Sequence, residues 1–170
     1  MSEPLAERMR PQTLDEYVGQ QHLVGEGAVL RRMLESGRIP SFILWGPPGV
    51  GKTTLARIVA RQLKVPFYTL SAVTSGVKEV REVIERAKNS SFFNTTSPIL
   101  FIDEIHRFSK SQQDTLLGAV EHGTVTLIGA TTETPSFEVI RPLLSRCQVY
   151  VLKPLGKQDL QRLLERAITE

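Results

Sequence analysis

The sequence predicts an α/β fold in which helices cover a parallel sheet, and three observations predict it. Short, almost entirely apolar runs recur along the 170-residue chain, and segments with helical periodicity fill the gaps between them. A glycine-rich segment joins the first run to the first of these helices, and an acidic pair follows a later run. Alternation of strands and helices indicates a parallel sheet with crossover helices. Runs that are apolar throughout are typical of strands buried on both faces.

The N-terminal region is predicted to be helical before the sheet begins. Thr13–Glu16 has the pattern of a small capping box, which predicts the start of a short helix. Ala28–Leu34 has helical periodicity, and Gly37 and Pro40 should end that helix.

Five apolar runs have the length and composition of buried strands. They span Phe42–Trp45, Phe67–Leu70, Ile99–Ile102, Val125–Ile128 and Val149–Leu152. Segments with apolar residues at helical spacing lie between these runs or after the last one. They span Leu55–Leu63, Val77–Ala87, Gln112–Val120 and Lys157–Ile168. The last of these helices needs a partner for its apolar face. We therefore expect a core domain over residues 1–154 and the beginning of a second, helical domain, cut short, over residues 155–170.

Bulk composition excludes several classes of protein. The single cysteine, Cys147, excludes an intramolecular disulfide and a cysteine-rich metal site. No apolar run approaches the roughly 20 residues of a membrane helix, and the polar start does not resemble a signal peptide. These features favour a cytoplasmic protein. The net charge of +3 permits a nucleic-acid partner without arguing for one.

The glycine-rich segment after the first strand matches the phosphate-binding loop pattern at every required position. It consists of Gly46, Pro47, Pro48, Gly49, Val50, Gly51, Lys52 and Thr53. Glycines let the backbone N–H groups approach phosphates closely, and the following helix adds the positive end of its dipole. Lys52 would contact the β- and γ-phosphates, the Thr53 hydroxyl would ligate Mg²⁺, and Thr54 would complete the nucleotide contacts. The sequence therefore predicts a site for ATP and Mg²⁺.

An acidic pair and a pair of threonines follow two later strands. Asp103 and Glu104 come directly after Ile99–Ile102, so their carboxylates should lie at the carboxyl edge of the sheet beside the loop. Asp103 is predicted to hold Mg²⁺ and Glu104 to polarise the attacking water. Thr131 and Thr132 follow the fourth strand, and a hydroxyl there could orient that water. Thr132 is the better candidate.

The assembled order of motifs resembles AAA+ ATPases of the clamp-loader clade. Within that clade it resembles the family of replication-associated recombination protein A and the Werner helicase-interacting ATPase. The resemblance spans nearly the whole chain and rests on Arg8–Pro11, Leu14–Gln20, Ser71–Lys78, Asp103–Phe108, Gly129–Glu133 and Pro135–Val139.

This resemblance implies a three-layer P-loop NTPase fold with five parallel strands in the order 5-1-4-3-2. It implies that Val18 and Gly19 lie near the adenine and that Thr132 is the sensor residue after the fourth strand. It also implies that Arg146, in Ser145-Arg146-Cys147, is an arginine finger that completes the active site of a neighbouring subunit. The lid domain and the C-terminal oligomerisation region of the family are absent from these 170 residues.

The family resemblance further implies a DNA-dependent ATPase at stalled or gapped replication forks, and a nucleoid-associated location. Expected partners are junctions between single- and double-stranded DNA, single-stranded-DNA-binding protein and further copies of the chain, commonly in a tetramer. The alternatives are a clamp-loader subunit and an ATP-binding switch that recruits partners. A small-molecule kinase is disfavoured because the sequence has no arginine-rich lid. His106 is expected to be a solvent-facing helix cap, with coupling of the nucleotide site to a partner as the alternative. Cys147 is expected to be a structural thiol.

Overall fold

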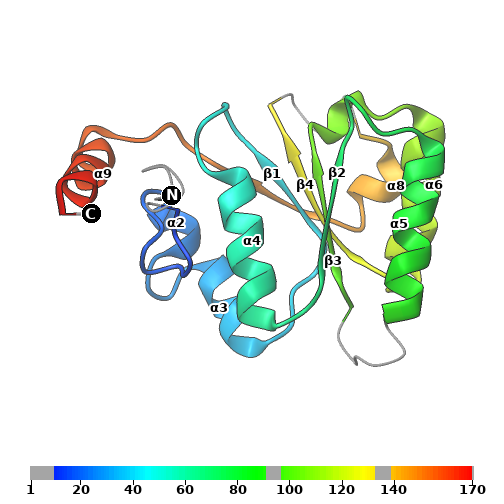
Figure 1. Ribbon diagram of the computed structural model, residues 1–170, viewed down its shortest axis with the longest axis horizontal. Coiled ribbons are helices and arrows are strands. Elements are labelled where there is room, and N and C mark those ends of the chain that lie inside the picture. Colours follow the sequence, from blue (N-terminus) through cyan, green and yellow to red (C-terminus); the bar gives the residue numbers. More distant parts are fainter. Residues whose placement is uncertain (1–9, 91–96, 133–138, 170) are drawn as a thin grey trace, which may run out of the picture.

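The computed structural model describes residues 10–90, 97–132 and 139–169, which form a central sheet with helices on both faces (Figure 1). Five strands lie in the order β2-β3-β4-β1-β5, and every neighbouring pair is parallel. The α/β fold and the predicted order 5-1-4-3-2 are confirmed, since the two orders name one sheet from opposite edges. Arg8, Met9, Glu133 and Pro135–Glu138, which contributed to the family resemblance, lie outside the described residues.

The strands fall close to the predicted apolar runs. They are β1 (Phe42–Trp45), β2 (Phe67–Ser71), β3 (Ile99–Asp103), β4 (Thr126–Thr131) and β5 (Gln148–Val151). β4 continues beyond Ile128 because its central position gives Gly129, Ala130 and Thr131 partners on β1. The prediction that every strand is buried on both faces is wrong for the two edge strands, β2 and β5. β5 leaves Val149 and Val151 exposed, and β2 leaves Thr69 exposed.

Helices precede, connect and follow the strands along the chain. They are α2 (Gln21–Val24), α3 (Val29–Ser36), α4 (Lys52–Leu63), α5 (Val77–Ser90), the 3-10 helix η1 (Ile105–Arg107), α6 (Lys110–Glu121), α8 (Arg141–Leu144) and α9 (Lys157–Thr169). The short elements α2, η1 and α8 were not predicted. The helix predicted at Thr13–Glu16 is wrong, because this segment forms a turn. The Glu16 carboxylate accepts from the N–H of Gln12 at 3.0 Å, so the capping pattern closes a turn and starts no helix.

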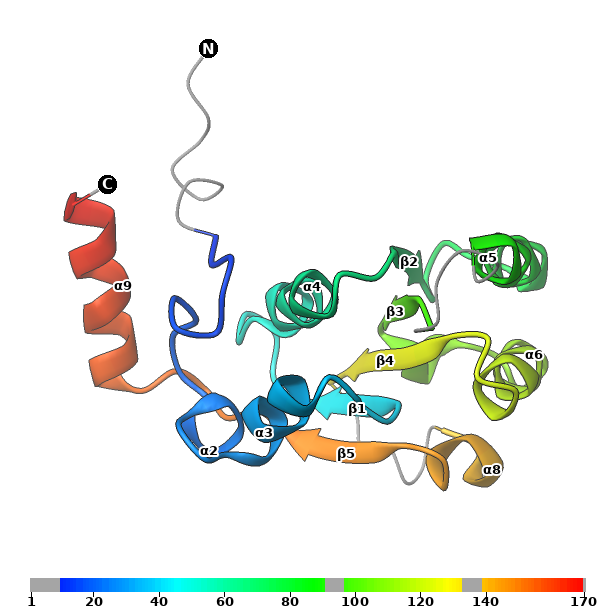
Figure 2. The same ribbon diagram turned by 90° about the horizontal axis from the view of Figure 1, so that it is seen from below.

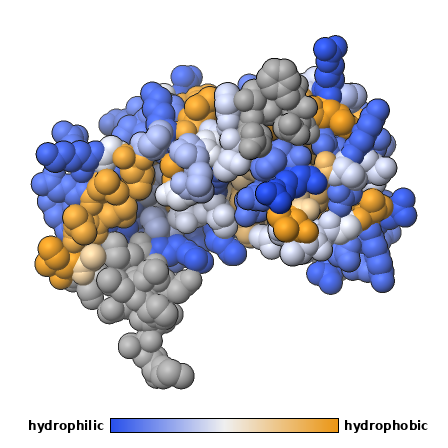
Figure 3. All heavy atoms as spheres, turned by 90° about the horizontal axis from the view of Figure 1, so that it is seen from above, coloured by the Kyte–Doolittle hydropathy of each residue, from blue (hydrophilic) through white to orange (hydrophobic). Residues whose placement is uncertain are grey.

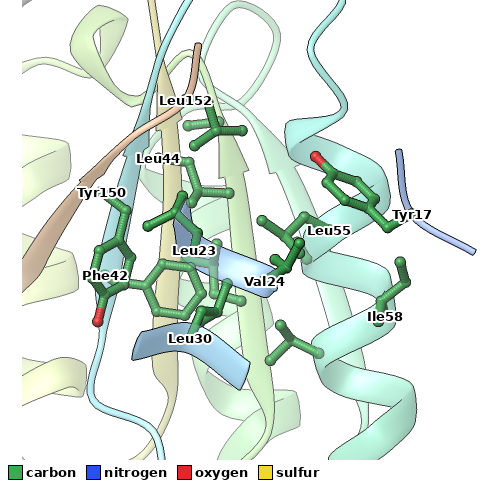
Figure 4. Close-up of a cluster of buried hydrophobic side chains, with 14 of the residues drawn as sticks. Tyr17, Leu23, Val24, Leu30, Phe42, Leu44, Leu55, Ile58, Tyr150 and Leu152 are labelled. Atoms are coloured by element: carbon green, nitrogen blue, oxygen red, sulfur yellow. The ribbon is translucent and has the colours of Figure 1, made fainter. Parts of the chain in front are cut away.

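Alternation along the strands divides the core into two clusters. On β1, Phe42 and Leu44 face α2, α3 and α4, whereas Ile43 faces α5, η1, α6 and α8. Figure 4 shows the first cluster, in which α4 contributes Leu55 and Ile58. Both faces of the central strands are thereby buried, which places the polar chemistry at the ends of the strands.

The C-terminal helix α9 lies at the end of the molecule away from α5 and α6 (Figure 2). It exposes an apolar stripe of Leu160, Leu164 and Ile168 over four-residue steps (Figure 3). Within the described ranges, no helix combines the length and the apolar character needed to cross a membrane.

Candidate functional site

The loop from Gly46 to Thr53 turns tightly between β1 and α4. Gly49 and Gly51 adopt φ of +80° and +90°, a backbone conformation that glycine accepts without strain. Position 46 has no room for a side chain, since a Cβ added to Gly46 would lie 2.7 Å from the carbonyl oxygen of Leu152. Its N–H donates to the Thr131 carbonyl oxygen at 3.1 Å, which holds the loop against the end of β4. The loop is therefore held by the neighbouring strands.

Lys52 folds its ammonium group into the loop. Nζ donates to the carbonyl oxygens of Gly46 at 2.6 Å and Pro47 at 3.3 Å. Burial lowers the pKa of Lys52 below its ordinary value, and the nearby negative charges of Asp103 and Glu104 partly oppose that effect. A single positive charge thus lies where the loop backbone turns, opposite two carboxylates.

A pocket of about 330 Å³ opens between this loop and the carboxyl ends of β3 and β4. Its lining residues are Pro48, Gly49, Gly51, Lys52, Thr53, Thr54, Asp103, Glu104, Thr131 and Thr132. Most of the predicted site residues therefore meet around one cavity. The Val50 side chain is an exception, because it is buried in the core and contributes only backbone to the loop.

The two carboxylates at the end of β3 differ in their surroundings. Asp103 is the exposed last residue of the strand. Glu104 has a φ of 52°, which is unusual for a residue with a side chain. Its Oε2 pairs with Nε of Arg107 at 3.1 Å. The left-handed backbone redirects the chain into η1, and Glu104 remains on the pocket wall.

The two threonines at the end of β4 have different environments. Thr132 is exposed on the pocket wall, whereas Thr131 is buried and its Oγ1 lies 2.9 Å from Nδ1 of His106. The expectation that His106 faces solvent is wrong, since the ring is half-buried within η1 and bonded to β4. No sequence pattern pointed to this bond.

The predicted adenine residues lie beside the pocket and not on its lining. Gly19 has a φ of +88°, and an added Cβ would lie 2.8 Å from Cδ2 of Leu155. A neighbouring side chain ties this segment down. The Tyr17 hydroxyl donates to the carbonyl oxygens of Val50 and Gly51, at 3.0 Å each. Val18 and Gly19 are therefore held between the loop and the chain that leaves β5.

The predicted finger, Arg146, lies away from the pocket of its own chain. It precedes β5, whose first residue pairs with Phe42 at the start of β1, whereas Gly46 follows the end of β1. At about 3.3 Å per residue, the strand separates the two by roughly 13 Å. Figure 2 shows α8, just before Arg146, beyond the amino end of β5. Arg146 cannot contact phosphates bound in the loop of its own chain from this edge.

Arg146 is held in place on its own subunit. Its Nη2 pairs with Oε1 of Glu121 at 2.9 Å, and Nη1 donates to the carbonyl oxygen of Pro142 at 3.0 Å. The side chain is nevertheless 44% exposed. Arg146 is thus fixed by Glu121 and Pro142 and still exposed enough to contact another molecule.

The donors around the pocket fit a nucleotide phosphate and one Mg²⁺ ion. Loop N–H groups and Lys52 suit phosphate oxygens, and the Thr53 hydroxyl with the Asp103 carboxylate offers the hard oxygen ligands that Mg²⁺ prefers. In the part of the chain that the structure describes, no group of three or more His, Cys, Asp or Glu side chains could hold a metal alone. Mg²⁺ commonly binds through one or two protein ligands together with substrate phosphates, and Thr53 and Asp103 could serve as two such ligands.

Comparison with known proteins identifies the family of the chain. The sequence model of the ATPase family associated with various cellular activities (AAA) matches residues 42–155. Replication-associated recombination protein A of Haemophilus influenzae is 53% identical over 98% of this chain, and that of Escherichia coli K12 is 54% identical over 99%. ATPase WRNIP1 of Dictyostelium discoideum is 50% identical over 97% of the chain and 19% of its own length. The chain spans 37% of the length of these two bacterial relatives.

Solved structures of Thermotoga maritima RuvB share the fold. One, described as a Holliday junction branch migration motor, superposes with a TM-score of 0.76 at 30% identity, covering 95% of this chain and 54% of RuvB. The structure of a single-residue variant of RuvB superposes equally well. The family match covers most of the residues that build the sheet and the whole of the pocket. The chain therefore belongs to the AAA family of ATPases, in the group that includes replication-associated recombination protein A and ATPase WRNIP1.

Proposed function

We propose that this chain binds ATP and Mg²⁺ in the pocket beside the Gly46–Thr53 loop and hydrolyses the γ-phosphate. The observation that carries the proposal is the convergence of Lys52, Thr53, Asp103, Glu104 and Thr132 on one cavity of about 330 Å³. These residues supply the charge, the metal ligands, the base and the sensor hydroxyl that phosphoryl transfer needs.

Each group has a distinct task in this proposal. The loop N–H groups bind the phosphates, and Lys52 leaves its carbonyl partners to contact the β- and γ-phosphates. Glu104 leaves Arg107 and accepts a proton from the attacking water, while Thr132 orients that water. The Thr53 hydroxyl and the Asp103 carboxylate would hold Mg²⁺, which would supply neutralisation of charge on the phosphate oxygens.

Arg146 completes the site of a neighbouring copy in this proposal. Arg146 lies too far from the phosphate-binding loop of its own chain to act there, so it acts on the loop of a neighbouring copy. Its ion pair with Glu121 fixes the guanidinium while leaving it exposed. Such fingers contribute about 10³–10⁵ to the rate of phosphoryl transfer. The chain then works as a homo-oligomer, which we propose to be a tetramer in the full-length protein. We further propose that α9 begins a helical lid over residues 155–170 and that Val18 and Gly19 contact the adenine.

We propose that the ATPase acts on DNA at stalled or gapped replication forks, together with single-stranded-DNA-binding protein, in a nucleoid-associated role. The names of the bacterial relatives, which place them in replication-associated recombination, support this proposal. The likeness to a branch migration motor supports action on DNA junctions as well.

The test is steady-state phosphate release by the full-length protein with intact duplex, gapped duplex or no DNA. Glu104→Gln should retain ATP binding and lose hydrolysis, whereas Glu82→Gln, the same change at an exposed position on α5, should behave as the parent protein. Stimulation by gapped DNA that Glu104→Gln abolishes supports the whole proposal. Hydrolysis at the same rate with and without DNA supports the ATPase activity and contradicts the proposed function at replication forks. A Glu104→Gln variant that loses ATP binding as well contradicts the role of Glu104.

A further inference from the structure

The 3-10 helix η1 crosses closely over the end of β4. Ile105 is fully buried there, and a Cβ added to Gly129 would lie 3.1 Å from Cδ1 of Ile105. One residue further on, Nδ1 of His106 lies 2.9 Å from Oγ1 of Thr131. An apolar contact and a hydrogen bond therefore fix η1 against this strand at two successive positions.

This hydrogen bond lies between the two groups that handle the attacking water. Glu104 precedes His106 by two residues, and Thr132 directly follows Thr131. Thr131 is 1% exposed, so a hydrogen bond to it is shielded from water. The bond therefore joins the segment that carries Glu104 to the segment that carries Thr132 by a short path.

Glu104 also needs external support for its backbone. Its φ of 52° lies in the left-handed region, which is strained for a residue that carries a side chain. Such a conformation persists only where the surrounding structure holds it. The Arg107 ion pair is exposed and holds the carboxylate of Glu104, whereas His106 and Ile105 hold the turn itself.

We propose that His106 is a positioning residue for hydrolysis, which sets the separation between Glu104 and Thr132 through its hydrogen bond to Thr131. The inference rests on the proposed function, in which Glu104 activates water and Thr132 orients it. His106 does not line the pocket, so it acts through its neighbours and contacts no reacting atom.

The chemistry of the imidazole provides matched substitutions. Nδ1 is attached directly to Cγ, and the amide atoms of asparagine occupy the equivalent position. His106→Asn can therefore keep a hydrogen bond to Thr131, whereas His106→Leu fills a similar volume without a polar atom. Thr131→Val removes the hydroxyl at nearly constant shape, and Thr131→Ser retains it.

The experiment compares these four single variants, the double variant His106→Leu/Thr131→Val and Glu104→Gln in the full-length protein. It measures kcat and KM for ATP, the Kd of a fluorescent ATP analogue and urea unfolding without nucleotide. His122→Asn, on an exposed histidine at the end of α6, is the control for a general histidine effect.

We expect His106→Leu and Thr131→Val each to lower kcat by about 10- to 100-fold, the scale of an ångström-sized misplacement of catalytic groups. The analogue Kd should change less than about threefold, the double variant should match the single variants, and Asn and Ser should restore most of kcat. The inference would be overturned if the two single variants lowered kcat additively in the double variant, or if His106→Asn were as slow as His106→Leu. A loss of affinity for the ATP analogue as large as the loss of kcat would overturn it as well. If His106→Leu fails to fold, the comparison of kcat between Thr131→Val and Thr131→Ser tests the inference instead.

The outcomes separate this inference from the proposed function. A parent protein with no Glu104-dependent hydrolysis contradicts both. A parent that hydrolyses ATP through Glu104, with His106→Leu and Thr131→Val equally active, contradicts the role of His106 alone.

Discussion

The side-chain amide of Gln20 pairs with both backbone polar groups of Lys153. Nε2 donates to the carbonyl oxygen at 2.7 Å, and Oε1 accepts from the N–H at 2.8 Å. Gln20 is 6% exposed and follows Val18 and Gly19, while Lys153 follows β5. The amide therefore joins the segment proposed to contact adenine to the chain that leads into α9.

Gln20→Ala should destabilise the fold and weaken nucleotide binding together. It leaves the polar groups of Lys153 without their partner, which costs about 1–3 kcal/mol. Urea unfolding and titration with a fluorescent ATP analogue measure the two effects. Gln21→Ala, the same change at the exposed neighbouring position, should alter neither. A stable Gln20→Ala variant with parental affinity would show that the pairing does not support the site.

Tyr17→Phe should loosen the phosphate-binding loop. The hydroxyl bonds to the carbonyl oxygens of Val50 and Gly51, and burial raises its pKa above the ordinary value, so it remains a donor at neutral pH. Its loss should cost about 1–2 kcal/mol of stability and lower ATP affinity several-fold, measured by unfolding and by analogue binding. Tyr68→Phe, on half-buried β2, is the matched control. An equal loss of affinity in both variants would argue against a specific support of the loop.

Cys147 should react slowly with iodoacetamide in the folded 170-residue chain. Burial raises the pKa of its thiol to about 11. The thiolate is the reactive form, so at pH 8 we expect alkylation about 100-fold slower than in urea, where the pKa is near 8.5. The folded rate should keep rising between pH 9 and 10. It is the single cysteine, so mass spectrometry follows one site. A folded rate that levels off by pH 9 would show that the thiol is not shielded.

Local sequence patterns were sufficient to predict the phosphate-binding loop and most of the strands of the sheet. β1 matches its predicted bounds because the apolar run Phe42–Trp45 lies between Pro40 and Gly46, two residue types that favour turns and loops over strand interiors. The pocket could be predicted because the motifs after β1, β3 and β4 all lie at the carboxyl edge of a parallel sheet. The order of strands came from the family resemblance, since apolar runs do not specify their neighbours.

Contacts between distant residues could not be predicted. Gln20 and Lys153 are 133 positions apart, and no periodicity relates them. The bond from His106 to Thr131 depends on how η1 crosses β4, where Ile105 packs on Gly129. The exposure of Val149 and Val151 depends on β5 being an edge strand. Each of these features arises from tertiary packing and leaves no local signal.

Mixing two inactive variants should restore hydrolysis if Arg146 acts in trans. Arg146→Ala retains its own pocket and lacks the finger, whereas Glu104→Gln lacks the base and retains the finger. At equal proportions, about a quarter of the interfaces join an intact pocket to an intact finger, so phosphate release should recover to about a quarter of the parental rate. The mixture of Arg146→Ala with the double variant Glu104→Gln/Arg146→Ala is the control and should remain inactive. A finger acting in cis predicts no recovery in either mixture, and full activity of Arg146→Ala alone would remove Arg146 from the mechanism.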